Sequence, residues 1–450
     1  MSLLDRPLRE QAAAIAAGDA DPAELLDGCL ARIEARNPEL NAIVATFPEH
    51  SGRMLAGAPP GPLHGVPVAI KDEWPLPWRA ERLAAAELLT PRHPGESGPY
   101  RALRDAGAVI VGVANMHEYG AGSTGHLSVY GPARNPWDTS RCPGGSSSGS
   151  GAAVAGRLVA GAVGADGIGS IRYPAAYCGI TGLKPTFGRS AMEGHHVPDT
   201  TAIVSGPLCA DAADCRLLAG ALFRERLDAG DATGLRAGIL AGDPWDDCQP
   251  DVRAACEHAV EVLRAATGGE VREVAIAGID HALVASILVT QSDELAALTP
   301  AKLNTLSEEV SLIARALMKY RLLTPAAAVA RAHRIRTQIR RSLARAFEQV
   351  DVIAWPTVPA VAPPLDNTTV ELPSGTYPAD YANPRFGGLA NLTGVPAISV
   401  PVGLDAAGMP IGLQLHAAWG RDELLLDAAA ALELATERRH VAAAPAPAMP

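Results

Sequence analysis

Short apolar runs alternate with segments of helical periodicity along the chain. Apolar residues recur at helical spacing through 22–40, and Asp21 before Pro22 is a favourable helix start. The apolar runs VPVAIK at 66–71, VIVGV at 109–113 and VDVIAWP at 350–356 are typical of buried strands. This alternation predicts an α/β fold with a largely buried sheet.

The pattern shows no break that would divide the chain. Residues 281–350 look mainly helical, and the cationic stretch 334–345 has the spacing of a solvated helix face. The Pro- and Asn-rich segment 362–385 is predicted to be a loop, and the tail 441–450 to be disordered. We therefore expect a single domain over residues 1–440.

Composition excludes several classes of protein. The 450 residues are 48% hydrophobic and 19% charged, which suits a large folded core. A net charge of −11 disfavours nucleic acid and anionic lipid as partners. The seven cysteines form no CxxC pair, so neither a disulfide framework nor a zinc site is expected. Without a signal-like start or a long apolar run, the predicted location is the cytoplasm, with no membrane contact.

Two glycine–serine clusters, GGSSSGS at 144–150 and GADGIGSIRYP at 164–174, are the main chemical signals. A flexible linker would not run directly into an apolar helix pattern. A phosphate loop would need a lysine after Gly149, and the GxGxxG match GAGSTG at 120–125 lacks a βαβ context. A GxSxG elbow centred on Ser147 needs a late histidine, and His416 lies on an apolar strand where core packing is common.

A fourth interpretation joins both clusters to Lys71. Serine is a weak nucleophile until a base activates it, and a lysine becomes a base when burial disfavours its ammonium form. Lys71 follows an apolar strand that would carry it into the core. Glycines beside Ser146 and Ser170 would expose backbone N–H donors of the kind that an oxyanion hole requires.

These residues resemble the amidase signature family, the Ser–cis-Ser–Lys amidohydrolases. The similarity is carried by GGSSSGSGAAVAG, GADGIGSIRYPAAYCGITGLKPTFGR, LHGVPVAIKD, YGPARNPWD and NLTGVPAISVPVG, and it spans roughly 8–437, with the signature core at about 60–220. It implies a large mixed central β-sheet covered by helices on both faces.

The resemblance also implies a mechanism that needs no metal or cofactor. Ser170 would attack a carboxamide, and Ser146, after a cis peptide bond, would pass the proton to Lys71. The implied oxyanion hole uses backbone N–H groups of Gly167, Ile168 and Gly169, together with that of Ser170. Supporting roles fall to Ser147 and to an ion pair of Asp166 with Arg172. The implied substrate-binding residues are Gly120, Ala121, Gly122 and Ser123.

The chain departs from the family pattern at several points. Ile168 stands where glycine is usual, and a β-branched residue does not readily adopt positive φ. Ala165 replaces a frequent hydroxyl residue, GHL at 125–127 replaces a Thr-Glu-Asn-like segment, and the stretch after Lys71 lacks its usual glycines and threonines. These differences leave the substrate open.

The functional prediction is an amidase that hydrolyses a small or medium-sized amide. An acyl transferase, an amidotransferase A-type subunit and an idle scaffold are the alternatives. We expect a neutral or aromatic acyl group, and a homodimer is the assembly that the family suggests. The residues expected to form the substrate walls are Tyr119, Leu127, Met318, Tyr381 and Phe386.

Overall fold

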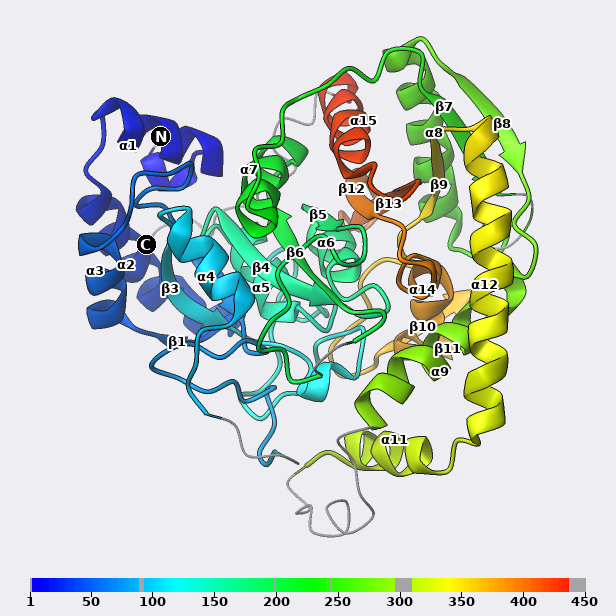
Figure 1. The fold of residues 1–450 in the computed structure, drawn as a ribbon, viewed down its shortest axis with the longest axis horizontal. Coiled ribbons are helices and arrows are strands. Elements are labelled where there is room, and N and C mark those ends of the chain that lie inside the picture. Colours follow the sequence, from blue (N-terminus) through cyan, green and yellow to red (C-terminus); the bar gives the residue numbers. More distant parts are fainter. Residues whose placement is uncertain are drawn as a thin grey trace.

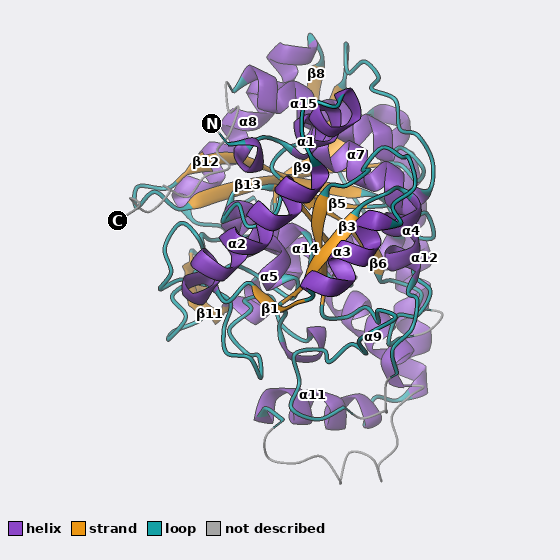
Figure 2. Cartoon of the chain, turned by 90° about the vertical axis from the view of Figure 1, so that its left-hand side faces the viewer, coloured by secondary structure: helices purple, strands orange, loops and turns teal. Residues whose placement is uncertain are grey.

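The computed structural model describes residues 2–88, 93–197, 200–240, 242, 245–295 and 310–436. Within these residues, eleven strands form one mixed sheet, in the order β1-β3-β2-β4-β6-β5-β12-β13-β9-β7-β8 (Figures 1 and 2). The bounds along that order are Ile43–Thr46, Val109–Ala114, Pro67–Lys71, Gly161–Asp166, Val204–Cys209, Thr181–Lys184, Ala397–Leu404, Pro410–Ala417, Val352–Pro356, Arg236–Leu240 and Glu270–Val274.

Fourteen α-helices within the described residues accompany the sheet (Figure 1). Their bounds are α1 Leu8–Ala17, α2 Pro22–Leu40, α3 Pro48–Ala56, α4 Gly98–Asp105, α5 Ser148–Ala155, α6 Arg172–Cys178, α7 Ala212–Phe223, α8 Pro250–Thr267, α9 Ala282–Leu295, α11 Leu312–Leu322, α12 Ala326–Gln349, α13 Ala379–Ala382, α14 Pro384–Thr393 and α15 Asp422–Ala435. Short 3₁₀ helices span Leu3–Asp5, Glu118–Gly120 and Ile279–His281.

Both faces of the sheet are buried against helices. Along β2, Val68 and Ile70 belong to one hydrophobic core and the intervening Ala69 belongs to another. Such alternation is what a strand produces when each face has its own cover. The core around Ala69 also contains residues of α2 and α5, whereas the core around Ile70 contains residues of α4 and α7. The predicted α/β fold with helices on both faces is confirmed.

The structure contains the helix start and the strand end that short stretches of sequence predict. The Asp21 carboxylate accepts a hydrogen bond from the Ala23 N–H at 2.8 Å, so it caps α2 as expected. Strand β2 ends at Lys71, as its apolar run predicts. No helix in the described part of the chain is long and apolar enough to cross a membrane.

One predicted loop is wrong. Within 362–385, β10 at Thr369–Leu372 and β11 at Gly375–Pro378 form a hairpin, and α13 and the first residues of α14 follow it. Val370 and Leu372 alternate with exposed residues and pack into a small separate core. Strand β10 has only four residues, so its alternation of buried and exposed positions does not stand out among the surrounding prolines and polar residues. The predicted disordered tail at 441–450 lies outside the described residues.

A buried arginine joins the early and late parts of the chain. The Arg172 side chain has no solvent exposure, and its Nε lies 3.0 Å from Oδ2 of Asp166 at the end of β4. Its Nη1 donates to Gln414 Oε1 on β13 at 2.8 Å, and its Nη2 donates to Gly387 O and Asn391 Oδ1 on α14 at 3.0 and 2.7 Å. Elements far apart in sequence therefore meet at one guanidinium.

We predict that Arg172→Met lowers the free energy of unfolding by about 3–5 kcal/mol, because it leaves the Asp166 carboxylate buried without its counter-charge. Chemical denaturation measures this loss. The matched control is Arg253→Met on α8, where the arginine side chain is 45% exposed and the expected change is below about 1 kcal/mol. Equal unfolding midpoints for the two variants would contradict the prediction.

Candidate active site

The site forms where two parallel strands end side by side. Strand β2 ends at Lys71 and β4 ends at Asp166, and Ile70 pairs with Val163 in parallel register. Because parallel strands finish at the same edge of a sheet, Lys71 lies next to the loop 167–170 that follows β4. Ser146 reaches the same place from the segment that leads into α5.

The serine cluster is a buried junction and not a linker. Residues 144–150 are all buried. At Gly149 a Cβ atom would lie 2.2 Å from the Ala42 carbonyl oxygen and 2.3 Å from the Asn115 amide nitrogen. Only glycine therefore lets the first turn of α5 pack this closely against the neighbouring backbone.

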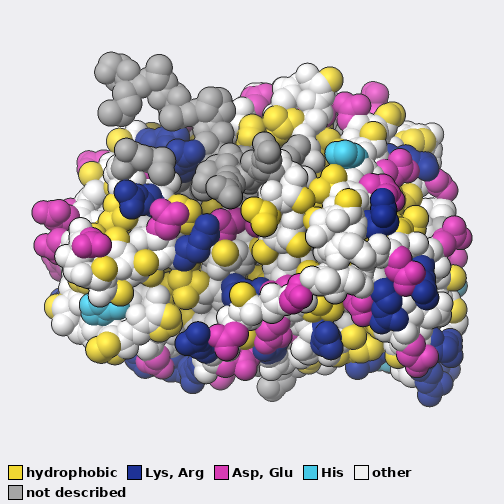
Figure 3. Space-filling model, turned by 90° about the horizontal axis from the view of Figure 1, so that it is seen from above, with side chains coloured by type: hydrophobic (Ala, Val, Ile, Leu, Met, Phe, Trp, Pro, Cys, Tyr) yellow, Lys and Arg dark blue, Asp and Glu magenta, His cyan; other side chains and the backbone are white. Residues whose placement is uncertain are grey.

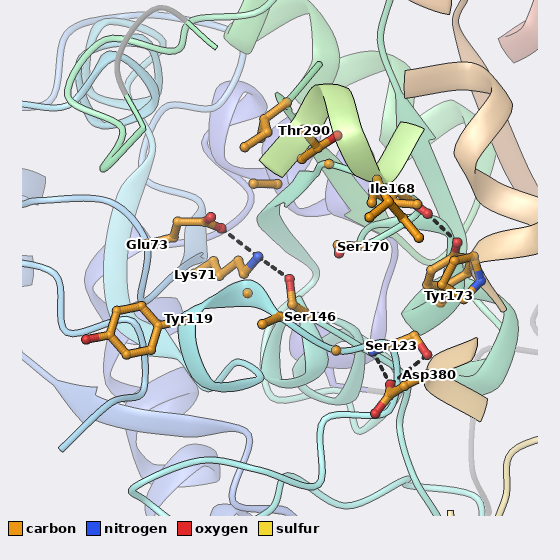
Figure 4. A pocket seen from close by; sticks show the side chains of 18 of the residues that line it. Lys71, Glu73, Tyr119, Ser123, Ser146, Ile168, Ser170, Tyr173, Thr290 and Asp380 are labelled. Atoms are coloured by element: carbon orange, nitrogen blue, oxygen red, sulfur yellow. Dashed lines mark hydrogen bonds and ion pairs between the residues drawn. The ribbon is translucent and has the colours of Figure 1, made fainter. Parts of the chain in front are cut away.

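Lys71, Ser146 and Ser170 face one another (Figure 4). The Lys71 side chain is 1% exposed, and its Nζ donates to Ser146 Oγ at 2.8 Å. The peptide bond before Ser146 is cis. Ser170 is half-buried and lies opposite Ser146, and all three residues line one cavity of 380 Å³.

The cavity walls agree with only part of the sequence expectation. The predicted binding residues Gly120, Ala121, Gly122 and Ser123 all line it, as do Tyr119 and Tyr381. The other three proposed wall residues, Leu127, Met318 and Phe386, are not among its lining residues. Met318 and Phe386 are 2% and 1% exposed and pack into hydrophobic cores.

The loop before Ser170 resolves the question raised by Ile168. Ile168 does not adopt positive φ, whereas Gly169 has φ +120°. The unusual backbone conformation therefore falls on a glycine, and the β-branched residue is accommodated without strain. The Tyr173 hydroxyl donates a hydrogen bond to the Ile168 carbonyl and so fixes the backbone of this loop.

The four proposed oxyanion donors are not equivalent. Gly169 donates its N–H to Asp166 Oδ1 at 2.6 Å. No hydrogen bond is found within the described residues for the N–H groups of Gly167, Ile168 and Ser170. The latter three are therefore available to a substrate oxygen, whereas Gly169 is already engaged.

Asp166 and Arg172 form the expected ion pair, and neither is exposed. Burial opposes ionisation of Asp166, but the charge and hydrogen bonds of Arg172 outweigh it and lower the pKa of that carboxyl.

Ser147 fixes the backbone around the site and takes no place in the predicted proton relay. Its Oγ donates to the Ala165 carbonyl at 3.1 Å, and its N–H donates to the Ser170 carbonyl at 3.2 Å.

The histidine required by the elbow interpretation lies elsewhere. His416 is fully buried and stacks on Trp355, with ring centroids 3.9 Å apart. Burial lowers the pKa of His416 well below its usual range. It does not line the cavity, so a Ser147–His416 pair is not formed.

Glu73 is a site residue that the sequence interpretation missed. It is 4% exposed, and its Oε2 lies 2.5 Å from Lys71 Nζ. Its Oε1 accepts from His195 Nε2 at 2.9 Å and lies 3.6 Å from His196 Nδ1. Burial opposes ionisation of Glu73, but Lys71 and His195 outweigh it and hold the pKa of Glu73 well below its usual range. The sequence signal that could have pointed to Glu73 is an acidic residue two positions after the lysine predicted to be buried.

A second missed residue is Asp380. It lines the cavity from α13, and its Oδ1 accepts from the Ser123 N–H at 2.5 Å and from Ser123 Oγ at 2.9 Å. Two groups of described side chains are close enough to share a metal ion: Glu73, His195 and His196 in one, and His117, His126 and Asp380 in the other. In the first group the carboxylate is already engaged by Lys71 and His195.

Comparison with known proteins identifies the relatives of this chain. A family model described as Amidase matches residues 24–426. The chain belongs to the amidase signature family. The recognition drawn from the serine–glycine motifs, and the assignment of the chain as an enzyme, are thereby confirmed.

Members of the amidase signature family with different named activities resemble this chain. The A-type subunit of glutamyl-tRNA(Gln) amidotransferase from Deinococcus deserti is 35% identical, over 94% of this chain and 95% of that protein. A crystal structure described as an amidase has a TM-score of 0.89 at 30% identity and covers 95% of this chain and 99% of its own. The structure of 6-aminohexanoate cyclic dimer hydrolase has a TM-score of 0.85 at 27% identity and covers 98% and 99%.

We predict that Gly169→Ala destabilises this amidase-family protein by more than the about 1–3 kcal/mol of backbone strain alone. A Cβ there would lie 2.1 Å from Tyr173 Cζ, in addition to the unfavourable φ. Chemical denaturation measures the effect. Gly188→Ala is the control, since Gly188 has φ +83° and no atom within 4 Å of the new Cβ. A loss no larger than in the control would refute the role of Tyr173.

Proposed function

We propose that this protein is an amidase that hydrolyses a small or medium-sized carboxamide to an acid and ammonia or an amine. The observation that carries the proposal is the 2.8 Å hydrogen bond from the buried Lys71 Nζ to Ser146 Oγ, with Ser170 opposite Ser146 in the same cavity. This is the arrangement of a nucleophile, a bridging hydroxyl and a base.

In the proposed reaction, Ser170 Oγ attacks the amide carbonyl carbon. Its proton moves to Ser146 while Ser146 passes its own proton to Lys71. The oxyanion accepts hydrogen bonds from the backbone N–H groups of Gly167, Ile168 and Ser170, which have no other acceptor among the described residues. The relay then runs backward and protonates the leaving nitrogen, and water hydrolyses the acyl-enzyme by the same route.

Glu73 has a definite electrostatic role in this scheme. Its carboxylate stabilises the ammonium form of Lys71, which is the form that exists once the proton has been accepted. It therefore favours the tetrahedral intermediate while it opposes formation of the neutral amine beforehand. Buried acids that orient and stabilise a protonated base serve catalytic relays in the same way.

The amidotransferase relatives support a second candidate function. The A-type subunits of this amidotransferase from several bacteria are 32–35% identical over nearly the whole chain, so this chain could instead release ammonia from glutamine for a partner protein. Hydrolysis of amides by the isolated chain separates the two functions. An amine that intercepts the acyl-enzyme would reveal the acyl-transferase alternative, since product would then need an added acceptor.

The nature of the partners follows from the same proposal. A small-molecule amide is the proposed substrate. On the face seen in Figure 3, acidic and basic side chains are interspersed. Location in the cytoplasm and a homodimeric assembly stay predictions of the sequence.

We expect a fluorophosphonate to add once to the wild type, and the adduct to be absent from Ser170→Ala. Lys71→Ala should label about 100-fold more slowly or worse, because the nucleophile loses its base. Intact-mass spectrometry measures both. Ser140→Ala, at an exposed position, is the control and should label normally. An adduct that persists in Ser170→Ala would place the nucleophile elsewhere.

Replacing Glu73 by glutamine tests the electrostatic role. Without the carboxylate, the ammonium that Lys71 becomes on accepting the proton has no counter-charge. We therefore expect kcat/KM to fall about tenfold or more, because the tetrahedral intermediate loses this stabilisation. Glu193→Gln, where the side chain is 62% exposed, should leave kcat/KM unchanged. An unchanged kcat/KM in Glu73→Gln would show that Glu73 does not act on Lys71.

A further inference from the structure

Asp380 is a carboxylate in the catalytic cavity that pairs with no cation among the described residues. It is half-buried on α13 and lines the cavity. Its hydrogen bonds within the described residues come from Ser123 N–H at 2.5 Å, Ser123 Oγ at 2.9 Å and Thr124 Oγ1 at 3.5 Å, and all reach Oδ1. None of the described side chains forms an ion pair with it, and Oδ2 has no such donor.

Lys71 and Arg321 also line the cavity, but neither forms an ion pair with Asp380. His117 and His126 lie nearest to the carboxylate, in one cluster with it. Burial lowers the pKa of His117 to about 4 and also lowers that of His126, although Asp380 opposes both shifts. Both shifts favour the neutral form of the ring. Lys71 is engaged by Glu73 and Ser146.

The carboxylate lies on the opposite side of the reacting groups from Glu73. Figure 4 shows Glu73 and Lys71 on one side of Ser146, and Asp380 with Ser123 on the other. Each of these two sides thus carries one acidic group, but among the described residues only Glu73 has a cation paired with it. A partly desolvated carboxylate is stabilised by a positive charge that arrives with a ligand.

We propose that Asp380 determines specificity by binding a protonated amine, so that the substrates are amides that also carry an ammonium group. This rests on the proposed amidase function and deepens it, and it departs from the neutral acyl group expected from the sequence. In the bound state Asp380 Oδ2 accepts from the ammonium while Oδ1 keeps its bonds to Ser123. The ammonium takes no part in the chemical step.

Binding to Ser170→Ala tests the proposal without turnover. The ligands are aminoalkanamides of increasing chain length and their isosteres in which a methyl group replaces the ammonium, measured by calorimetry at neutral pH. At the best chain length we expect the amine to bind about tenfold tighter or more than its isostere, the size of a charge-assisted hydrogen bond. Equal affinities at every chain length would overturn the proposal.

A second substitution separates charge from structure. Adding Asp380→Asn keeps an oxygen that accepts from Ser123 but removes the charge, and it should abolish the preference for the amine without weakening binding of the isostere. Asp366→Asn, at an exposed position, is the control for net charge and should keep the preference. A preference that survives in Asp380→Asn would assign amine recognition to another group.

The binding result does not depend on the identity of the nucleophile. If fluorophosphonate labelling fails and the amine preference is present and needs Asp380, the amidase mechanism is wrong and the cation site stands. If labelling follows the Ser170 prediction and no amine preference is found, the amidase function stands and the cation site is wrong.

Discussion

Arg172 and Asp166 form an ion pair that is entirely removed from solvent, and the loop before Ser170 is fastened to it. The carboxylate that accepts from Arg172 also accepts from the Gly169 N–H at 2.6 Å. The guanidinium in turn bonds Gln414 and the α14 backbone. Burying such charges is unfavourable unless hydrogen bonds satisfy them, and here the satisfying groups come from distant parts of the chain. The loop therefore has its geometry only when the whole sheet is assembled.

The position of Lys71, and not its burial alone, suits it to proton transfer. Lys184 is also fully buried, and burial lowers the pKa of Lys184 to about 7. Its Nζ donates to the carbonyl oxygens of Pro185 and Val395, however, and it does not line the cavity. A lysine with a favourable titration but no nucleophile within reach cannot serve as the base, so geometry decides between the two.

Charge in the cavity is arranged asymmetrically around the reacting groups. Glu73 is matched by Lys71, and the match supports a proton moving on and off the amine. Within the described residues, Asp380 is matched only by neutral hydroxyl and amide donors from Ser123 and Thr124. The first carboxylate thus belongs to the proposed chemistry and the second to proposed recognition of the substrate. Similar residue types take different roles because their neighbours differ.

Local patterns were enough to determine the elements that carry the site. The apolar run ending at Lys71 defined β2, and the serine–glycine clusters were enough to recognise the amidase signature family. The roles of Ser146 and Ser170 in one relay stay a proposal that the family resemblance suggests. The tertiary structure alone decided that Glu73 contacts Lys71, that Asp380 reaches the cavity from the hairpin region, and that Met318 and Phe386 turn into cores. The reason is physical: periodicity reports whether a segment can bury a face, whereas the partner of a side chain depends on distant segments packed against it.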